Sequence, residues 1–168
     1  MFMSMFDKPP PASTPVDCVA VYPFPGPPQS FVSGDPNGDR LRVAYFQRSS
    51  DGRLFARAWF GRGAEGPPGY AHGGSVAAVL DEAMGAAAWA AGQPSLAARI
   101  EVDFKAMVPL GTDANVEMAV EKVEGRKITT RARLLDADGR VLAESAGLFV
   151  RLTDDQIRDA LRLAAGGL

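Results

Sequence analysis

The sequence predicts an α+β fold in which a curved antiparallel sheet is wrapped around one long central helix. Residues 75–91 form an almost wholly apolar helical segment that is dominated by alanine and glycine. Strand-like segments separated by turn signals lie on both sides of it in the sequence. A helix this apolar must be covered on several sides, and its small residues allow the surrounding backbone to approach closely. A sheet curled around the helix satisfies both requirements.

The chain of 168 residues has the length of one domain, preceded by an arm. Residues 1–38 are rich in proline and glycine, so we expect an extended arm with few strand or helix signals. The arm also carries Phe24, Phe31 and Val32, which indicates that part of it lies on the domain surface. Residues 39–168 are expected to form a single domain.

Two strands and a loop are expected before the helix. Residues 41–60 read as two strands around a Ser-Asp-Gly turn, which is a hairpin pattern. A glycine-rich loop follows over residues 61–74, and the helix then ends at Gly92 and Pro94.

Four strands and a short helix are expected after it. Residues 96–108 alternate between apolar and charged side chains, as in a half-buried strand. Strands over 114–123, 126–135 and 140–152 are separated by turns at Gly125 and at Asp138-Gly139. Thr153 is a suitable N-cap for a final amphipathic helix.

Composition excludes several classes of function. A net charge of −2 and an aromatic content of 8% give no support to a nucleic-acid binder. One cysteine (Cys18) and one histidine (His72) are too few ligands for a classical zinc site. Composition leaves a carboxylate-based Mg²⁺ or Ca²⁺ site open, but no D-x-D-x-D-G loop is present, and we expect no metal and no cofactor. Asp81 and Glu82 interrupt the apolar run, which predicts a core helix and no membrane span. No signal peptide is recognised, so the cytoplasm is the expected location.

The two carboxylates of the helix allow two interpretations. Helical projection places Asp81 on one side of the apolar stripe and Glu82 on the other, at similar angles. Both can be ordinary solvent-facing charges, because acidic residues are seldom fully buried unless paired. Alternatively, one of them faces a cleft and acts as a general base or nucleophile. Periodicity does not choose between them.

The turn His72-Gly73-Gly74 before the helix also has two interpretations. It can be a surface histidine followed by a flexible entry to the helix. However, the first N–H groups of a helix are unpaired and point outwards, and glycines let a ligand oxygen come close to them. That is the geometry of an oxyanion hole, which stabilises the negative oxygen of a reacting carbonyl.

The stretch PPGYAHGGSVAAVLDEAMG (residues 67–85) resembles the signature of the hotdog-fold acyl-CoA thioesterases. That signature is a glycine-rich loop, His-Gly-Gly, and an acid nine residues after the histidine, which here is Asp81. The resemblance extends over roughly residues 40–152. It implies the hotdog fold and selects Asp81 over Glu82.

The resemblance also implies a role for each residue of the motif. Asp81 is expected to be the general base or the nucleophile, and the Gly73 N–H the oxyanion donor. His72 is expected to orient the loop, the thioester or the leaving thiolate, and Gly74 to line the substrate site. The implied activity is hydrolysis of an acyl-CoA to a carboxylic acid and CoA.

Two departures from the family pattern are visible. Many relatives carry a threonine or serine on the strand after the helix, which the partner subunit supplies to hold the water. The matching position here is Ala97, and Ser95 or backbone can take over that role. Some relatives carry asparagine or glutamine at the position of Gly66. The loss of the hydroxyl motivates an alternative function, a hotdog protein that binds acyl-CoA without hydrolysis. A hotdog hydratase or dehydratase is the weaker alternative.

The resemblance further implies a homodimer or homotetramer with active sites between subunits. The CoA phosphates would need cations, for which Arg126, Lys127 and Lys105 are candidates. Each of these can instead be a solvated surface charge.

Overall fold

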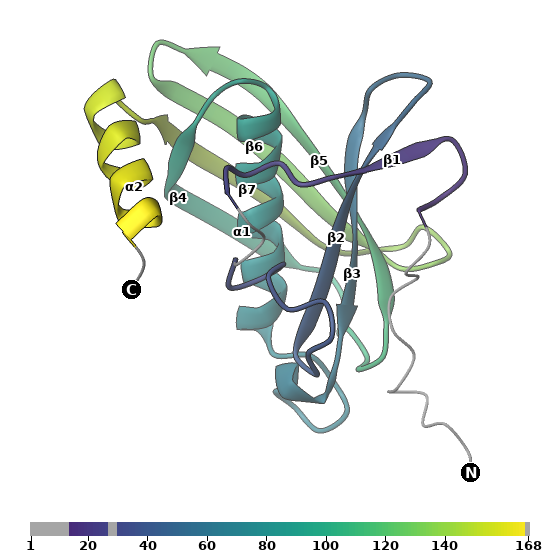
Figure 1. Ribbon diagram of the computed structural model, residues 1–168. Coiled ribbons are helices and arrows are strands. Elements are labelled where there is room, and N and C mark those ends of the chain that lie inside the picture. The colour runs from purple at the N-terminus through teal and green to yellow at the C-terminus, as the bar shows by residue number, and fades with distance from the viewer. Residues whose placement is uncertain (1–13, 27–29, 167–168) are drawn as a thin grey trace.

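The computed structural model describes residues 14–26 and 30–166 (Figure 1). In chain order its elements are β1 (Cys18–Val21), β2 (Leu41–Arg48), β3 (Leu54–Phe60), the 3-10 turn η1 (Arg62–Ala64), α1 (Gly73–Ala90), β4 (Ser95–Phe104), β5 (Asp113–Glu124), β6 (Lys127–Leu135), β7 (Val141–Arg151) and α2 (Asp154–Gly166). The expected hairpin, central helix, four following strands and final helix are therefore all present.

The strands form one antiparallel sheet that curves around α1 (Figure 1). Their order is β1-β2-β3-β5-β6-β7-β4, so β1 and β4 are the edges. Helix α1 contacts β3, β4, β5, β6 and β7. Its buried residues lie on most sides of the helix: Val76, Val79, Leu80, Ala83, Met84, Gly85, Ala86, Ala87 and Ala88. The prediction of a curved sheet around one central helix is confirmed.

Local hydrogen bonds set the ends of the two helices. Helix α1 begins at Gly73, two residues earlier than expected, because His72 acts as its N-cap. Helix α2 begins after Thr153, whose Oγ1 accepts from the Gln156 N–H at 3.3 Å. The Gln156 side chain accepts from the Thr153 N–H at 2.9 Å in return, which completes a capping box.

The arm contains a strand that the sequence analysis did not expect. Strand β1 pairs antiparallel with β2, with Cys18 opposite Arg48. Four residues among prolines carry too little pattern to signal a strand, and the exposed edge of β2 supplies the pairing partners. Residues 1–13 of the arm lie outside the described residues.

After β1 the arm lies against α1 and the inner face of β2. The Phe24 ring packs edge-on against Tyr45 and Trp89, with ring centroids 6.2 and 6.5 Å apart. Val32 is buried, whereas Phe31 is 76% exposed. The arm therefore covers part of the helix surface that the sheet leaves open (Figure 1).

Within residues 14–26 and 30–166, no helix is long and apolar enough to cross a membrane.

Candidate active site

The loop before α1 is held in place by backbone hydrogen bonds. The His72 N–H donates to the Ala64 carbonyl at 2.7 Å, and an isolated bridge joins Glu65 to Ala71. A second bridge joins Tyr70 to Pro109, beyond β4. These bonds fix the position of His72 at the N-terminus of the helix.

His72 leaves one N–H open at the start of the helix. Its Nδ1 accepts from the Gly74 N–H at 2.8 Å, and its carbonyl oxygen accepts from the Ser75 N–H at 2.9 Å. Among the described residues, no acceptor is found for the Gly73 N–H. Because Nδ1 accepts, the proton of a neutral ring lies on Nε2. Gly73 is therefore the donor that remains available to a ligand.

Close packing against His72 explains why position 66 is a glycine. A Cβ on Gly66 would lie 2.8 Å from the His72 Cα, closer than real contacts allow. The asparagine or glutamine of some relatives therefore cannot be accommodated here without displacing the capping histidine.

The two carboxylates of α1 differ in their partners. Both are partly buried, so neither is a fully exposed surface charge. Glu82 accepts hydrogen bonds from the Tyr45 hydroxyl, at 2.9 Å, and from the Ser30 hydroxyl. Asp81 has no hydrogen-bond or ion-pair partner among residues 14–26 and 30–166. Asp81 is thus the carboxylate that is free to act on a ligand.

The surroundings make Asp81 more basic than an exposed aspartate. Burial raises the pKa of the Asp81 carboxyl, and the negative charge of Glu82 raises it further. Burial also raises the pKa of the Tyr45 phenol well above its ordinary value, with Glu82 as the second cause. Tyr45 is therefore a neutral donor to Glu82, and Asp81 is suited to accept a proton.

Asp81 borders a cavity of about 590 Å³ between the arm, α1 and the start of β4. Ala97 and Ser95 border the same cavity, and the Ser95 carbonyl accepts a hydrogen bond from the Trp89 Nε1–H at 3.1 Å. The Ser95 hydroxyl is buried and has no hydrogen-bond partner in the described part of the chain. A buried hydroxyl without a partner is unfavourable unless water or a ligand reaches it.

Gly73 borders a different cavity of about 340 Å³, together with Phe104, Lys105 and Met107. Gly73 and Asp81 are eight positions apart on α1, or about 12 Å along its axis. A base and an oxyanion donor must each come within about 3 Å of the reacting atoms. Within one chain the two groups are therefore too far apart to serve the same carbonyl.

The three candidate cations lie at different places. The Arg126 guanidinium donates to the Arg151 carbonyl at 3.0 and 3.1 Å. Arg126 and its neighbour Lys127 lie at the β5–β6 turn, at the opposite end of α1 from Gly73 (Figure 1). Lys105 lies at the Gly73 cavity and forms an ion pair with Glu144 at 2.9 Å.

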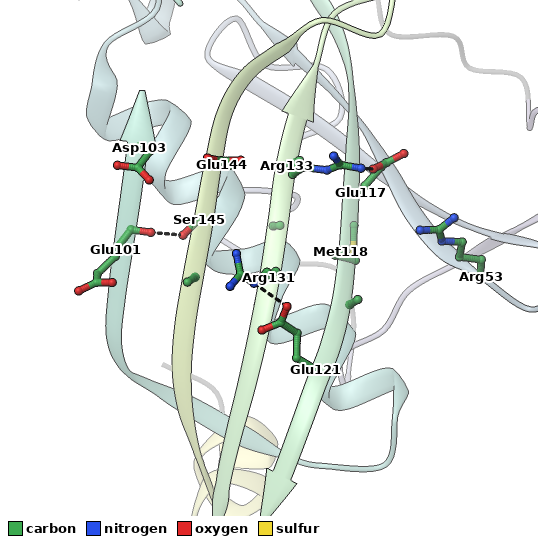
Figure 2. Close-up of a pocket in the computed structure, with 13 residues that line it drawn as sticks. Arg53, Glu101, Asp103, Glu117, Met118, Glu121, Arg131, Arg133, Glu144 and Ser145 are labelled. Atoms are coloured by element: carbon green, nitrogen blue, oxygen red, sulfur yellow. Dashed lines mark hydrogen bonds and ion pairs between the residues drawn. The ribbon is translucent and has the colours of Figure 1, made fainter. Parts of the chain in front are cut away.

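A further hollow, of about 410 Å³, lies on the outer face of the sheet (Figure 2). It contains none of the candidate residues. Arg131 pairs with Glu121, and Arg133 pairs with Glu117 across neighbouring strands. Ion pairs of this kind on an exposed sheet are typical of a solvated face.

Sequence reasoning missed the bonds of Glu82 to Tyr45 and Ser30. These residues are 37 and 52 positions away from Glu82, and no periodic pattern connects them.

Changing His72 tests the cap. His72→Ala removes the side-chain acceptor of the Gly74 N–H and should lower the free energy of unfolding by about 0.5–2 kcal/mol. His72→Asn keeps an acceptor and should lose much less. Urea unfolding followed by circular dichroism measures both variants, and equal losses would show that the cap does not stabilise the helix.

Changing Glu82 tests the electrostatics of Asp81. Glu82→Gln keeps an acceptor for Tyr45 but removes the charge, so the Asp81 pKa should fall while burial keeps it above its ordinary value. Carbon-detected NMR titration measures this shift.

The same pKa also predicts how stability changes with pH. The Asp81 pKa is higher in the folded than in the unfolded chain. The free energy of unfolding should therefore fall as the pH rises from the unfolded-state pKa to the folded-state pKa. Asp81→Asn should remove this fall. An unaltered pH dependence of unfolding in that variant would contradict a raised Asp81 pKa.

The sequence of this chain is similar to those of known thioesterases. The family model described as "Thioesterase superfamily" matches residues 68–143. The acyl-coenzyme A thioesterase THEM4 of Xenopus laevis is 33% identical over 119 residues, which are 70% of this chain and 54% of the relative. THEM5 of Mus musculus is 37% identical over 89 residues, 52% of this chain and 36% of the relative. The chain thus spans about half or less of the length of these relatives.

Solved structures share the fold. A thioesterase superfamily protein is 30% identical with a TM-score of 0.66, over 73% of this chain and 60% of that one. A Bacillus halodurans protein, solved with CoA, is 23% identical with a TM-score of 0.59, over 66% of this chain and 74% of that one. At 23% identity, the similarity to the second protein shows only that the two chains share a fold. Together they confirm the fold expected from the sequence.

Proposed function

The chain belongs to the thioesterase superfamily and has its hotdog fold, and on this premise we propose that it hydrolyses acyl-CoA thioesters. The observation that carries the proposal is Asp81, a carboxylate that has a raised pKa, lies at the wall of a largely apolar cavity and has no partner within residues 14–26 and 30–166. Carboxylates in such surroundings are suited to proton transfer near neutral pH.

The proposed reaction uses two groups of the chain. Asp81 takes a proton from water while the water oxygen attacks the thioester carbonyl carbon; alternatively, Asp81 attacks the carbonyl itself and water then releases the acyl group. The Gly73 N–H donates to the carbonyl oxygen as it becomes negative. In the general-base route the C–S bond of the tetrahedral intermediate then breaks, which gives the carboxylic acid, and the CoA thiolate takes the proton that Asp81 removed from water. In the nucleophilic route the C–S bond breaks as the acyl–Asp81 anhydride forms; water then hydrolyses the anhydride to the carboxylic acid and the Asp81 carboxylate, and its other proton goes to the thiolate. His72 contributes by holding Gly74 and thereby the orientation of the Gly73 N–H.

We infer that a complete site combines Gly73 of one protomer with Asp81 of its partner in a homodimer. The support is their separation along α1 and their location at two different cavities. A two-fold axis would form two such sites at once. Large exposed apolar side chains border both cavities, with Leu96 at one and Phe104 and Met107 at the other. Such side chains are typical of a surface that another chain covers.

Lys105, at the Gly73 cavity, is our candidate for contact with the CoA phosphates. Arg126 and Lys127 lie at the opposite end of α1. They can contact the CoA phosphates only if a further subunit brings them to the Gly73 cavity. Gly74 lies in the proposed oxyanion turn, although His72 already occupies its N–H. We retain the cytoplasm as the proposed location, since Cys18 is a free thiol.

The main alternative is acyl-CoA binding without hydrolysis, and Ala97 motivates it. Its side chain at the Asp81 cavity supplies no hydroxyl to hold water. The Ser95 hydroxyl borders the same cavity and has no hydrogen-bond partner among the described residues, so it is our candidate to hold water in place of the missing hydroxyl. A hydrogen bond from Ser95 to the attacking water would satisfy both groups.

The activity is tested with acyl-CoAs of different chain length and release of free thiol as the readout. We expect turnover with at least one substrate, and a loss of about a hundredfold or more in Asp81→Asn, because the amide cannot take up the proton. Saturable binding without thiol release would favour the alternative. Crotonyl-CoA hydration without thiol release would indicate a hydratase instead.

The oxyanion donor is tested by two substitutions at the first residue of α1. Gly73→Pro removes the N–H, and proline is well accepted at this position because His72 already has the extended backbone that a following proline requires. Gly73→Ala keeps the N–H, and its methyl group would meet Phe104 at an ordinary 3.5 Å. We expect the proline variant to have a kcat about a hundredfold below the alanine variant. Equal rates would remove Gly73 from the mechanism.

A further inference from the structure

We infer that Gly85 and the Phe24 ring of the N-terminal arm set the size of the acyl group, and that their cavity takes an apolar acyl group larger than acetyl. The inference rests on the proposed function, since it assigns the cavity beside Asp81 to the acyl part of the substrate. It concerns residues outside the His-Gly-Gly motif, one of them in the arm.

The cavity has the chemistry of an apolar subsite. It measures about 590 Å³, which lies within the range of small-molecule sites. Five aromatic side chains border it, those of Tyr22, Phe24, Phe31, Trp89 and Phe149, and Val32, Ala78, Leu96 and Ala97 add further apolar wall. A thioester carbonyl placed at Asp81 would extend its acyl chain into this space. An acetyl group would leave most of it unfilled.

The described residues of the arm on either side of positions 27–29 border this cavity and are held in place. Ser30 donates a hydrogen bond to Glu82, which also accepts from Tyr45. Phe24 packs edge-on against Tyr45 and Trp89. The arm is thus held on both sides of the cavity by residues of α1 and β2.

Gly85 forms the floor of the cavity. It lies one helical turn after Asp81 and one turn before Trp89, so all three share one side of α1. A Cβ there would meet Phe149 at 3.5 Å and Phe24 at 3.9 Å, which are ordinary contacts. Neither packing nor a positive φ requires glycine at this position, and glycine is unfavourable inside a helix. What the glycine leaves free is the volume of one methyl group in front of the Phe149 and Phe24 rings, at the border of the cavity.

The experiment compares kcat/KM for acetyl-, hexanoyl-, dodecanoyl- and phenylacetyl-CoA in three variants. Gly85→Ala fills the floor, so the ratio of each larger substrate to acetyl-CoA should fall about tenfold or more. Phe24→Ala enlarges the cavity, so the dodecanoyl-to-hexanoyl ratio should rise. Phe55→Ala is the control, because Phe55 packs against Phe46 in the sheet and does not border the cavity. It should change all substrates by the same factor.

Binding of non-hydrolysable S-alkyl-CoA thioethers of the same lengths is measured in parallel by calorimetry. Tighter binding of the longer thioethers in the wild type, weakened selectively by Gly85→Ala, supports the inference whether or not the protein hydrolyses thioesters. Absence of turnover with this binding pattern intact would overturn the proposed function alone. Unaltered substrate ratios and equal thioether affinities in Gly85→Ala would overturn the inference while leaving hydrolysis in place.

Discussion

The burial of α1 inside the curved sheet is the constraint on which the rest of the structure depends. Val76, Leu80 and Met84 are at most 2% exposed, and alanines let the strands approach the helix closely. A helix enclosed in this way exposes its polar groups only at its ends and where the sheet leaves a gap. Its N-terminus and its two carboxylates occupy these places, which concentrates the candidate chemistry on one element.

The two carboxylates show how the protein treats a charge on a buried helix. Glu82 is satisfied by two hydroxyls, one from β2 and one from the arm, and so becomes part of the structure. Asp81 has no such partner within the described residues, and burial and the Glu82 charge raise its pKa. An unpaired, partly buried acid is unfavourable for folding, so its presence at a cavity favours a functional role. Glu82 thus contributes twice, by holding the arm and by making its neighbour more basic.

Patterns that repeat along the chain were sufficient to predict the architecture. The apolar helix, the strand alternation and the Asp-Gly turn each depend on neighbouring residues, and each predicted element is present. Helical projection did not distinguish Asp81 from Glu82; the resemblance selected Asp81, which the structure leaves unpartnered among the residues it describes. Strand β1 is too short to have a pattern of its own.

Contacts between distant segments could not be predicted from local patterns. The Glu82 bonds join residues 37 and 52 positions apart, and sequence patterns do not encode such distances. The separation of Gly73 from Asp81, in contrast, follows from the sequence, because eight positions of helix imply about 12 Å.

The central claim is that one site uses Gly73 of one protomer and Asp81 of the other, and mixing two inactive variants tests it most directly. Gly73→Pro and Asp81→Asn chains are unfolded together, refolded, and assayed for thiol release. In a shared site, each mixed dimer has one site with both native groups, so random mixing should restore about a quarter of the wild-type activity. Activity that stays at the level of the separate variants, in a mixture shown to contain mixed dimers, would contradict the account.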